Sequence, residues 1–502
     1  MPMKIIAAES LGSARFMLDY GLRYAYLAGS MYQGIASKQM VVALGKSGLM
    51  GYFGTGGLTL AEIEAALRDI QAELRGGQSY GMNLLCNTAR ADLEAGCVEL
   101  FLRYKVRYLE ASAFTQVTPS VVHYRLKGIS RTPGGQVHIP NHVLAKVSRP
   151  EVAAAFMRPP PVAIVAKLVR GGALTEEEAT LGLSVPAAGE ICVEADSGGH
   201  TDQGVAYALV PAIRALRDEQ QSKYGYASPI KVGAAGGIGT PDAAAAAFVL
   251  GADFIMTGSI NQCTVEAGTS EAVKDVLEDV EVQDTTYAPA GDLFEIGSKV
   301  QVVRRGLFFP SRANRLFELY QRYNSVDDID ESTREQIEVH YFRRSFEEVW
   351  SETKSYVARA FPDRIGALER NGKQRMALIF KWYFIHSARL ALQGSVAQKM
   401  DYQIHCGPAL GAFNSWVKGT DLQSWRRRHV ADLAVRIMTG AAEVLDARFA
   451  AFARHGSRSA HSPGSREAVD SAQGQSAVAL TCARDDVSLA CTERSALPCL
   501  GI

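Results

Sequence analysis

Three apolar stretches in the middle of the chain end in glycines at regular spacing, and this feature constrains the fold most. They are EADSGGH (194–200), AAGGIGTP (234–241) and TGS (257–259). Residues 231–253 are long enough for one strand, one helix and two tight connections, and 242–250 (DAAAAAFVL) is a strong helix former. Parallel barrels repeat units of this length, so the spacing predicts consecutive βα units.

The glycines at these strand ends indicate a site for a phosphate group. Gly236, Gly237 and Gly258 let the main chain approach an anion because no Cβ stands in the way. The Ser259 hydroxyl is a further donor, and a helix N-terminus behind such a loop adds free N–H groups. Glycines also shape ordinary turns, but two such loops at barrel spacing favour the phosphate site that barrels form after strands seven and eight.

Strand-like and helix-like segments alternate from about residue 24 onward. Thr59 and Glu62 form a capping-box pattern, and apolar residues at spacings of three and four predict an amphipathic helix after it. Eight strands that alternate with helices predict an α/β fold, a (β/α)8 TIM barrel, in preference to an open sheet. The predicted strands are 24–28, 49–53, 80–85, 106–109, 143–147, 191–195, 230–234 and 254–256.

The chain is predicted to have four parts. Residues 1–14 are an N-terminal extension, and 15–320 form the barrel, with a helical insertion at about 159–189. Residues 321–452 form an additional C-terminal α-helical domain, whose aromatic faces we expect to be packing surfaces. Residues 453–502 are rich in Ser, Ala, Arg and Gly without periodicity, which predicts a disordered tail. The helices expected in the C-terminal domain are 332–360, 367–393 and 426–454.

Composition disfavours several classes of function. Lysine plus arginine number 53, as do aspartate plus glutamate, so no basic field favours nucleic acid. The start of the chain lacks the apolar core of a signal peptide and no apolar run reaches membrane-spanning length, so we expect a cytoplasmic protein without a membrane partner. The eight cysteines show no metal-type spacing, so we expect thiols and no metal site.

Six motifs, in order along residues from about 11 to 450, resemble the PfaD family, the trans-acting enoyl reductases of polyketide and polyunsaturated fatty acid synthases. The barrel part is similar to the wider group of nitronate monooxygenases (2-nitropropane dioxygenases) and FMN-dependent enoyl-ACP reductases, whereas the last two motifs point to PfaD-type proteins. The chain departs from the family at His405, where Trp is more usual. The motifs are YAYLAGSMYQGIASK (24–38), GYFGTGGL (51–58), EADSGGHTD (194–202), AAGGIGTPDAAAAAFVLGADFIMTGSINQCTVEAGTS (234–270), DTTYAPAGDLFEIG (284–297) and DYQIHCGPALGAFNSWVKG (401–419).

The resemblance implies a non-covalent FMN, reduced by NADPH or NADH, that then reduces an α,β-unsaturated thioester carried on acyl carrier protein. The partners would be polyketide or fatty acid synthase modules. Ala28, Gly29 and Met31 would lie against the isoalloxazine, where small residues permit close approach. Asn83, at the end of the third predicted strand, offers an amide that can donate to and accept from a ring edge. The glycine loops would hold the phosphate.

Two charged residues and a glycine pair complete the implied flavin site. Lys146, at the end of the fifth predicted strand, would place a positive charge near the flavin N1–C2=O edge and favour the anionic reduced flavin. A lysine at a strand end can instead project into solvent. Asp196, with Gly198 and Gly199, belongs to the loop after the sixth strand, although an aspartate before two glycines also serves ordinary turns.

His200 is the candidate catalytic residue. Hydride addition to Cβ of an enoyl thioester leaves an enolate at Cα and the carbonyl oxygen. An imidazole with a pKa near neutrality can donate a hydrogen bond to that oxygen or a proton to Cα. His200 follows two glycines at the end of a strand, which leaves it room to face a flavin. Water or another residue remains an alternative proton donor to Cα.

Two other functions are compatible with the sequence. A nitronate monooxygenase would use the same barrel and the same histidine with oxygen as oxidant, but it needs no additional helical domain. A non-catalytic flavin-binding assembly subunit is disfavoured because His200 and both phosphate loops are present. The choice between NADPH and NADH, the acyl chain and the oligomeric state, a homodimer included, stay open.

Overall fold

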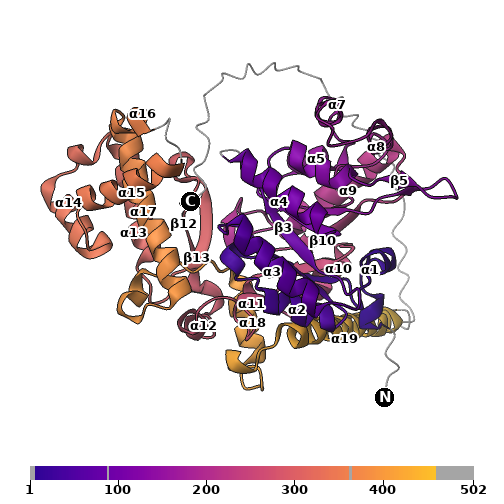
Figure 1. The fold of residues 1–502 in the computed structure, drawn as a ribbon. Helices are drawn as coiled ribbons and strands as arrows, with labels where there is room; N and C mark the ends of the chain where they lie inside the picture. The colour runs from indigo at the N-terminus through magenta and orange to yellow at the C-terminus, as the bar shows by residue number, and fades with distance from the viewer. Residues whose placement is uncertain (1–5, 88–89, 361–364, 460–502) are drawn as a thin grey trace, which may run out of the picture.

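Eight parallel strands form a closed barrel in a computed structural model that describes residues 6–87, 90–360 and 365–459 (Figure 1). The order around the barrel is β1-β11-β10-β8-β7-β4-β3-β2, so the first strand pairs with the last, with Tyr26 opposite Ile255. The predicted (β/α)8 barrel is confirmed. The strands are β1 (Tyr26–Ala28), β2 (Met50–Phe53), β3 (Gly81–Leu85), β4 (Tyr108–Ser112), β7 (His142–Val147), β8 (Glu190–Glu194), β10 (Lys231–Ala235) and β11 (Ile255–Thr257).

The predicted strands were placed correctly but their ends were not. The largest difference is in the fourth, predicted at 106–109, because the ladder with β3 begins only where Tyr108 meets Gly81. His142, expected to precede the fifth strand, is its first residue. Strand ends depend on the neighbouring strand, which local sequence does not specify.

Helices surround the barrel, and their capping residues explain where they begin. Thr59 accepts from the Glu62 N–H while the Glu62 carboxylate accepts from the Thr59 N–H, so the predicted capping box is present. The expected insertion at 159–189 contains two short helices, α7 and α8. The helices are α2 (Lys38–Lys46), α3 (Leu60–Glu73), α4 (Ala91–Arg103), α5 (Pro119–Leu126), α6 (Pro150–Met157), α7 (Val162–Arg170), α8 (Glu176–Gly182), α9 (Ala206–Tyr224) and α10 (Pro241–Val249).

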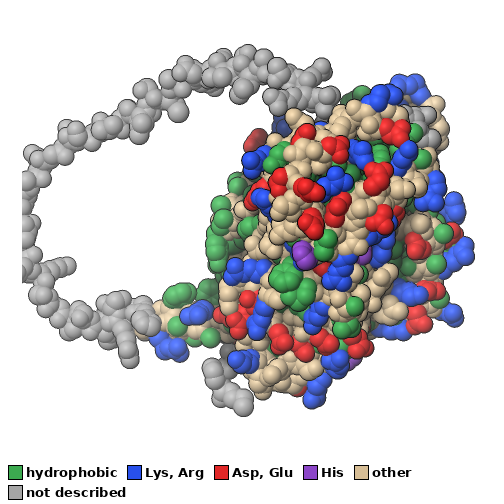
Figure 2. All heavy atoms as spheres, turned by 90° about the vertical axis from the view of Figure 1, so that its left-hand side faces the viewer, with side chains coloured by type: hydrophobic (Ala, Val, Ile, Leu, Met, Phe, Trp, Pro, Cys, Tyr) green, Lys and Arg blue, Asp and Glu red, His purple; other side chains and the backbone are tan. Residues whose placement is uncertain are grey.

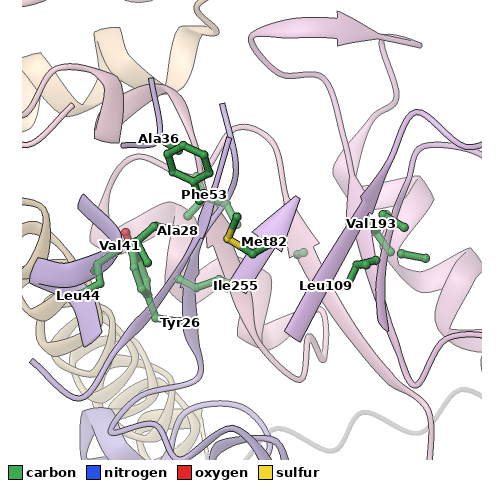
Figure 3. Packing of buried hydrophobic residues seen from close by; sticks show 14 of the residues in the cluster. Tyr26, Ala28, Ala36, Val41, Leu44, Phe53, Met82, Leu109, Val193 and Ile255 are labelled. Carbon is green, nitrogen blue, oxygen red and sulfur yellow. The ribbon is translucent and has the colours of Figure 1, made fainter. Parts of the chain in front are cut away.

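The amino-terminal end of the barrel is closed by a short helix, α1 (Ala14–Tyr20). Phe16 is fully buried and its ring stacks on Phe254 at 4.4 Å, while Tyr20 stacks on Tyr108. The cluster that holds Phe16 and Tyr20 includes Leu27 and Met256 of the strands, whereas the residues labelled in Figure 3 belong to the larger main cluster. The barrel interior is therefore packed at this end, and the opposite end is left for a site.

A separate lobe follows the barrel, with its own hydrophobic cluster over residues 288–384. It lies beside the barrel in Figure 1, and Figure 2 shows acidic and basic side chains interspersed over its outer face. Sequence analysis missed its two strands, which pair with each other and with β9 (Gly199–Thr201) in an antiparallel sheet. The lobe contains β12 (Thr285–Pro289), β13 (Lys299–Val303), α13 (Phe309–Arg322), α14 (Glu331–Gln336), α15 (Phe346–Ala360), α16 (Ile365–Glu369) and α17 (Gly372–Gln393).

The single helix predicted over 332–360 is interrupted in the structure, so this prediction was wrong. After α14 the chain forms a π-helical turn, Ile337–Phe342, and Arg343 then takes a left-handed conformation with φ of 55°. Left-handed backbone cannot continue a right-handed helix, so α15 starts anew at Phe346. The burial of Phe342 and Phe346 in one cluster explains why the break is tolerated.

The last two helices pack on the barrel, whereas the sequence predicted that everything from 321 to 452 forms one separate helical domain. Residues 402–445 share the hydrophobic cluster of the barrel and not that of the lobe. Gly440 of α19 (Val430–Ser459) packs on α10, where a Cβ would lie 2.6 Å from Pro241. We therefore propose that the lobe is an insertion of about 285–401, and that α18 (Pro408–Val417) and α19 complete the barrel unit.

The last helix extends beyond the predicted end of the helical domain. The predicted disordered tail began at 453, but α19 continues to Ser459; residues 460–502 lie outside the described part. Within the described ranges, no single helix is both long and apolar enough to span a bilayer, although the bent pair α6–α7 meets those two criteria jointly.

Removing the Phe16 ring should destabilise the barrel strongly. Phe16→Ala leaves a cavity between Tyr20 and Phe254, so we expect the free energy of unfolding to fall by about 3–5 kcal/mol. Leu18→Ala on the same helix is the control, because Leu18 is 73% exposed and its loss should change stability by less than about 0.5 kcal/mol. Denaturant unfolding measures both, and equal effects would contradict the closure role of α1.

Candidate active site

The carboxyl ends of the barrel strands carry the polar residues of the candidate site. Ala28, Asn83 and Lys146 lie on β1, β3 and β7, at the ends where sequence analysis placed them. Two further acidic residues, Glu110 on β4 and Glu194 on β8, stand among them. In parallel barrels this end holds the active site, because the loops after all eight strands converge there.

Lys146 lies between two carboxylates and does not project into solvent. Its Nζ is 3.5 Å from Glu194 Oε1 and 3.9 Å from Glu110 Oε1, and only 17% of its side chain is exposed. Burial by itself lowers the pKa of Lys146, but the Glu194 and Glu110 carboxylates outweigh burial and raise it. Lys146 is therefore a fixed cation at the barrel mouth.

Glu110 organises the floor of the site, and sequence analysis missed it. Its Oε2 accepts from the Ser30 N–H at 3.1 Å and from Asn83 Nδ2 at 3.3 Å. The Asn83 amide also donates to Ser112 Oγ at 3.0 Å, so its N–H groups already serve the protein. Glu110 is fully buried, and its Oε1 has no hydrogen-bond partner among the described residues. A lone glutamate ending a barrel strand was the available signal.

The residues after β1 form a tight wall. Ala28 and Gly29 are buried, and the Gly29 N–H donates to Thr257 O at 2.9 Å. A Cβ on Gly29 would lie 2.9 Å from Met256 Sδ. Met31 is half-buried, and its carbonyl lies so close to Gly54 that a Cβ there would overlap it. The wall thus has no room for larger side chains.

Four of the five glycines predicted in the cofactor loops divide into two kinds. A Cβ on Gly237 or Gly258 would meet no atom within 4 Å, so these two face open space. Gly236 instead packs on the Ala195 carbonyl, 2.5 Å from an added Cβ, and Gly198 packs on the main chain of Cys406. The structure thus leaves two glycines available to a ligand and gives two a packing contact.

The segment 401–419 covers the glycine loops. The Gly407 N–H donates to Ser259 Oγ at 3.0 Å, which leaves the Ser259 hydroxyl hydrogen free to donate elsewhere. Next to it, burial and the nearby His200 lower the pKa of His405 to about 4. His405 is therefore a neutral imidazole, and its Nε2 lies 2.7 Å from Gln403 Nε2.

His200 lies on β9, which the lobe holds in place. It is opposite Val300 of β13 in the antiparallel ladder, and its Nε2 lies 2.8 Å from Asp292 Oδ1. Nearly half of the imidazole, 47%, is exposed, so one face remains accessible. Burial lowers the pKa of His200, but the hydrogen bond to Asp292 and the negative charges of Asp292 and Glu194 together outweigh burial, and the pKa is raised.

Asp196 anchors the loop that carries His200. Its carboxylate accepts from Tyr287 Oη at 2.6 Å, from Thr201 Oγ1 at 2.7 Å and from Gln301 Nε2 at 3.3 Å. Gly199, with φ of 87°, pairs with Gln301 in the same sheet. Both oxygens of Asp196 thus bind the protein, which favours anchoring over the predicted contact with a cofactor; that contact stays a prediction.

Comparison with known proteins reveals close relatives over most of the chain. A family model for the inserted helical domain of [acyl-carrier-protein] S-malonyltransferase matches residues 323–402, within the lobe. Polyketide biosynthesis protein PksE of Bacillus subtilis is 56% identical over 444 residues, which are 88% of this chain and 57% of PksE. Polyketide biosynthesis protein ThaF of Burkholderia thailandensis is 52% identical, over 88% of this chain and 38% of ThaF.

A solved structure covers the same region from end to end. The enoyl reductase domain of MlnA, from the macrolactin biosynthesis cluster of Bacillus amyloliquefaciens, matches with a TM-score of 0.86 and 47% identity. The match covers 89% of this chain and 100% of that domain. The chain belongs to the PfaD family. This PfaD-family chain spans little more than half the length of PksE and less of ThaF.

The structure brings most of the predicted residues of this PfaD-family chain together. Asn83, Lys146 and the glycine loops lie at one end of the barrel, and His200 reaches it from the sheet shared with the lobe. Glu110 and Asp292 were not predicted. Within the described ranges no group of three or more His, Cys, Asp or Glu side chains could hold a metal ion.

Adding a methyl group at Gly198 should disturb the packing of the site loops. A Cβ there would lie 2.8 Å from Cys406 Cα and from the Gly407 nitrogen, so main chain must move. We expect Gly198→Ala to lower the free energy of unfolding by about 1–3 kcal/mol. Gly171→Ala is the control, because its Cβ would make only ordinary contacts, 3.4 Å or more. Denaturant unfolding that shows no difference between them would contradict this packing.

Proposed function

We propose that this protein is an FMN-dependent, NAD(P)H-consuming enoyl reductase. It would act in trans on α,β-unsaturated acyl thioesters bound to acyl carrier protein, in polyketide or polyunsaturated fatty acid synthesis. The observation that carries the proposal is the end-to-end match to the enoyl reductase domain of MlnA. The barrel mouth supports it, because a histidine stands beside a buried lysine and two open glycine loops.

The residues present fit a flavin mononucleotide. Gly237 and Gly258 face open space and would present main-chain N–H groups to its phosphate, with the Ser259 hydroxyl as a further donor. The small residues Ala28 and Gly29 would lie against the ring system. Glu110 Oε1, which faces the Lys146 ammonium at 3.9 Å without a hydrogen bond, is a buried acceptor in the same region that a ligand N–H could satisfy.

Lys146 would act at the polar edge of the ring as a hydrogen-bond donor. Two carboxylates, Glu110 and Glu194, already face its ammonium group, so the trio has a formal charge of minus one. The positive charge of Lys146 is therefore largely compensated inside the protein. Lys146 would therefore contribute a hydrogen bond to the flavin from a fixed position.

His200 would complete the reduction on the substrate. FMN bound there would supply, once reduced by NAD(P)H, the hydride for Cβ of the enoyl thioester. The His200 imidazolium would stabilise the enolate oxygen or give its proton to Cα, and a proton from solvent would restore the imidazolium. One hydride and one proton thus saturate the double bond and leave NAD(P)⁺.

We further propose a carrier protein and synthase modules as partners, in the cytoplasm. The lobe matches a model from an enzyme named for acyl carrier protein, and PksE and ThaF are polyketide biosynthesis proteins. The lobe also contributes to the site mouth through β9 and Asp292. A homodimer and the choice of NADPH remain predictions.

Loss of the His200 imidazole should slow the reduction of the enoyl thioester but not the reduction of the flavin by NADPH. In anaerobic stopped-flow experiments, we expect His200→Ala to bind FMN and to be reduced by NADPH at the normal rate. Its reoxidation by a crotonyl thioester of phosphopantetheine should be slower by about 10²–10⁴-fold, because proton donation is lost. His340→Ala, which removes an exposed histidine of the lobe, should behave as the wild type.

Other outcomes identify the alternatives. If the wild-type flavin stays reduced until oxygen or a nitronate is added, the nitronate monooxygenase interpretation replaces this one. A protein that binds FMN but turns over no substrate would be an assembly subunit. A protein that cannot be loaded with FMN would contradict the proposed cofactor.

A further inference from the structure

The helical lobe supplies the side chain that contacts the candidate catalytic histidine. Asp292 lies in the lobe between β12 and the short 3-10 helix Phe294–Ile296. Its Oδ1 is 2.8 Å from His200 Nε2, although 92 positions separate the two residues in the chain. Asp292 Oδ1 thus holds one imidazole nitrogen, whereas His200 Nδ1 makes no hydrogen bond among the described residues.

The main chain of His200 is held by the same lobe. The register of β9 with β13 places Thr201 opposite Lys299 and His200 opposite Val300. In an antiparallel ladder, register determines both the height and the direction of each side chain. The lobe therefore orients the imidazole twice, once through its main chain and once through Asp292.

Asp292 is itself supported from α17. The Lys381 ammonium donates to the Asp292 carbonyl at 3.4 Å and forms an ion pair with Glu295 at 3.3 Å. Only 3% of the Lys381 side chain is exposed. The neighbouring Gly291 packs on Phe384, where a Cβ would lie 2.9 Å away. The carboxylate therefore stands on a loop that is fastened to the lobe core.

Several charged groups act on the imidazole from different elements. Besides Asp292, Glu194 of β8 raises the pKa of His200 and Lys146 of β7 lowers it. His405, with a pKa lowered to about 4, is neutral at the pH values of interest, and Lys381 and Glu295 compensate each other behind Asp292. Burial raises the pKa of Asp292, but the hydrogen bond to His200 and the positive charges of His200 and Lys381 together outweigh burial and lower the pKa, which favours the carboxylate.

We propose that Asp292 is a positioning residue that fixes the orientation and the protonation of the His200 imidazole, so that the lobe completes the active site. The proposal rests on the proposed function for its catalytic meaning. A carboxylate on Nε2 stabilises the imidazolium and leaves the second nitrogen to donate its proton to the substrate enolate. Asp292 itself takes up no proton in this step.

The first test needs no catalysis. In full-length protein with ¹³Cε1-labelled histidine, NMR titration gives the pKa of His200, assigned by the signal lost in His200→Gln. We expect Asp292→Asn to lower that pKa by about one unit, because the nearest opposite charge is removed. Glu318→Gln, which neutralises an exposed carboxylate of the lobe, should leave it unchanged. An unchanged His200 pKa in Asp292→Asn would overturn the proposal.

The second test uses the two half-reactions. A raised pKa increases the protonated fraction of His200, and this contribution is lost as the pH rises through that pKa. In Asp292→Asn the loss should therefore occur about one pH unit lower, with reoxidation by the enoyl thioester up to about tenfold slower at pH values above the wild-type pKa. FMN content and the rate of reduction by NADPH should stay within about twofold of the wild type.

Two comparisons separate positioning from a structural role. In a His200→Ala background, Asp292→Asn should have no additional effect on reoxidation. An additional loss there, or a parallel loss of FMN binding and of both half-reactions, would mean that Asp292 only supports the fold and would overturn the proposal. If the wild type fails to reduce any enoyl thioester, the proposed function fails, and the NMR titration alone decides the role of Asp292.

Discussion

Closure of the barrel between β1 and β11 is the constraint on which the remaining structure depends. It joins strands from opposite ends of the first half of the chain, with Leu27 opposite Met256. Once closed, the sheet has no edge, and all strands bring their carboxyl-terminal halves to the same rim. The convergence of Asn83, Glu110, Lys146 and Glu194 follows from this geometry, because no two of them belong to the same strand.

The rim holds charged side chains that are largely shielded from water. Lys146 is stable there because Glu110 and Glu194 oppose it, and Glu110 in turn accepts from Ser30 and Asn83. Burying such groups costs several kcal/mol each unless their partners are in place, so their arrangement is rigid and specific. Within the described part of the chain Glu110 Oε1 makes no hydrogen bond, and it faces the Lys146 ammonium at 3.9 Å.

The lobe is more than an addition to the barrel. Its sheet takes β9 from the barrel loop as its third strand, and Asp196 fastens that loop to Tyr287 and Gln301. The chain leaves the barrel before β12 and returns to it with α18 and α19. The pairing of β9 with β13 and the bonds of Asp196 attach the lobe to the barrel, in keeping with the proposed insertion. The position of His200 therefore depends on a region that lies outside the barrel.

Local sequence patterns determined much of this architecture. Apolar runs, glycine turns and caps such as Thr59 act over a few residues, and they identified eight strands and most helices. They failed at strand ends and at the break beside Arg343, where neighbouring elements decide. The phosphate loops and the role of His200 stay predictions.

Tertiary structure decided the partners. The contact of Asp292 with His200, the opposition of Lys146 by two carboxylates and the packing of Gly198 on Cys406 join residues far apart in sequence. The return of residues 402–445 to the barrel is of the same kind, because amphipathic helices look alike whichever core they cover. The sequence by itself thus determined which segments form the barrel and which residues reach its rim. Only long-range packing decided what each of them contacts there.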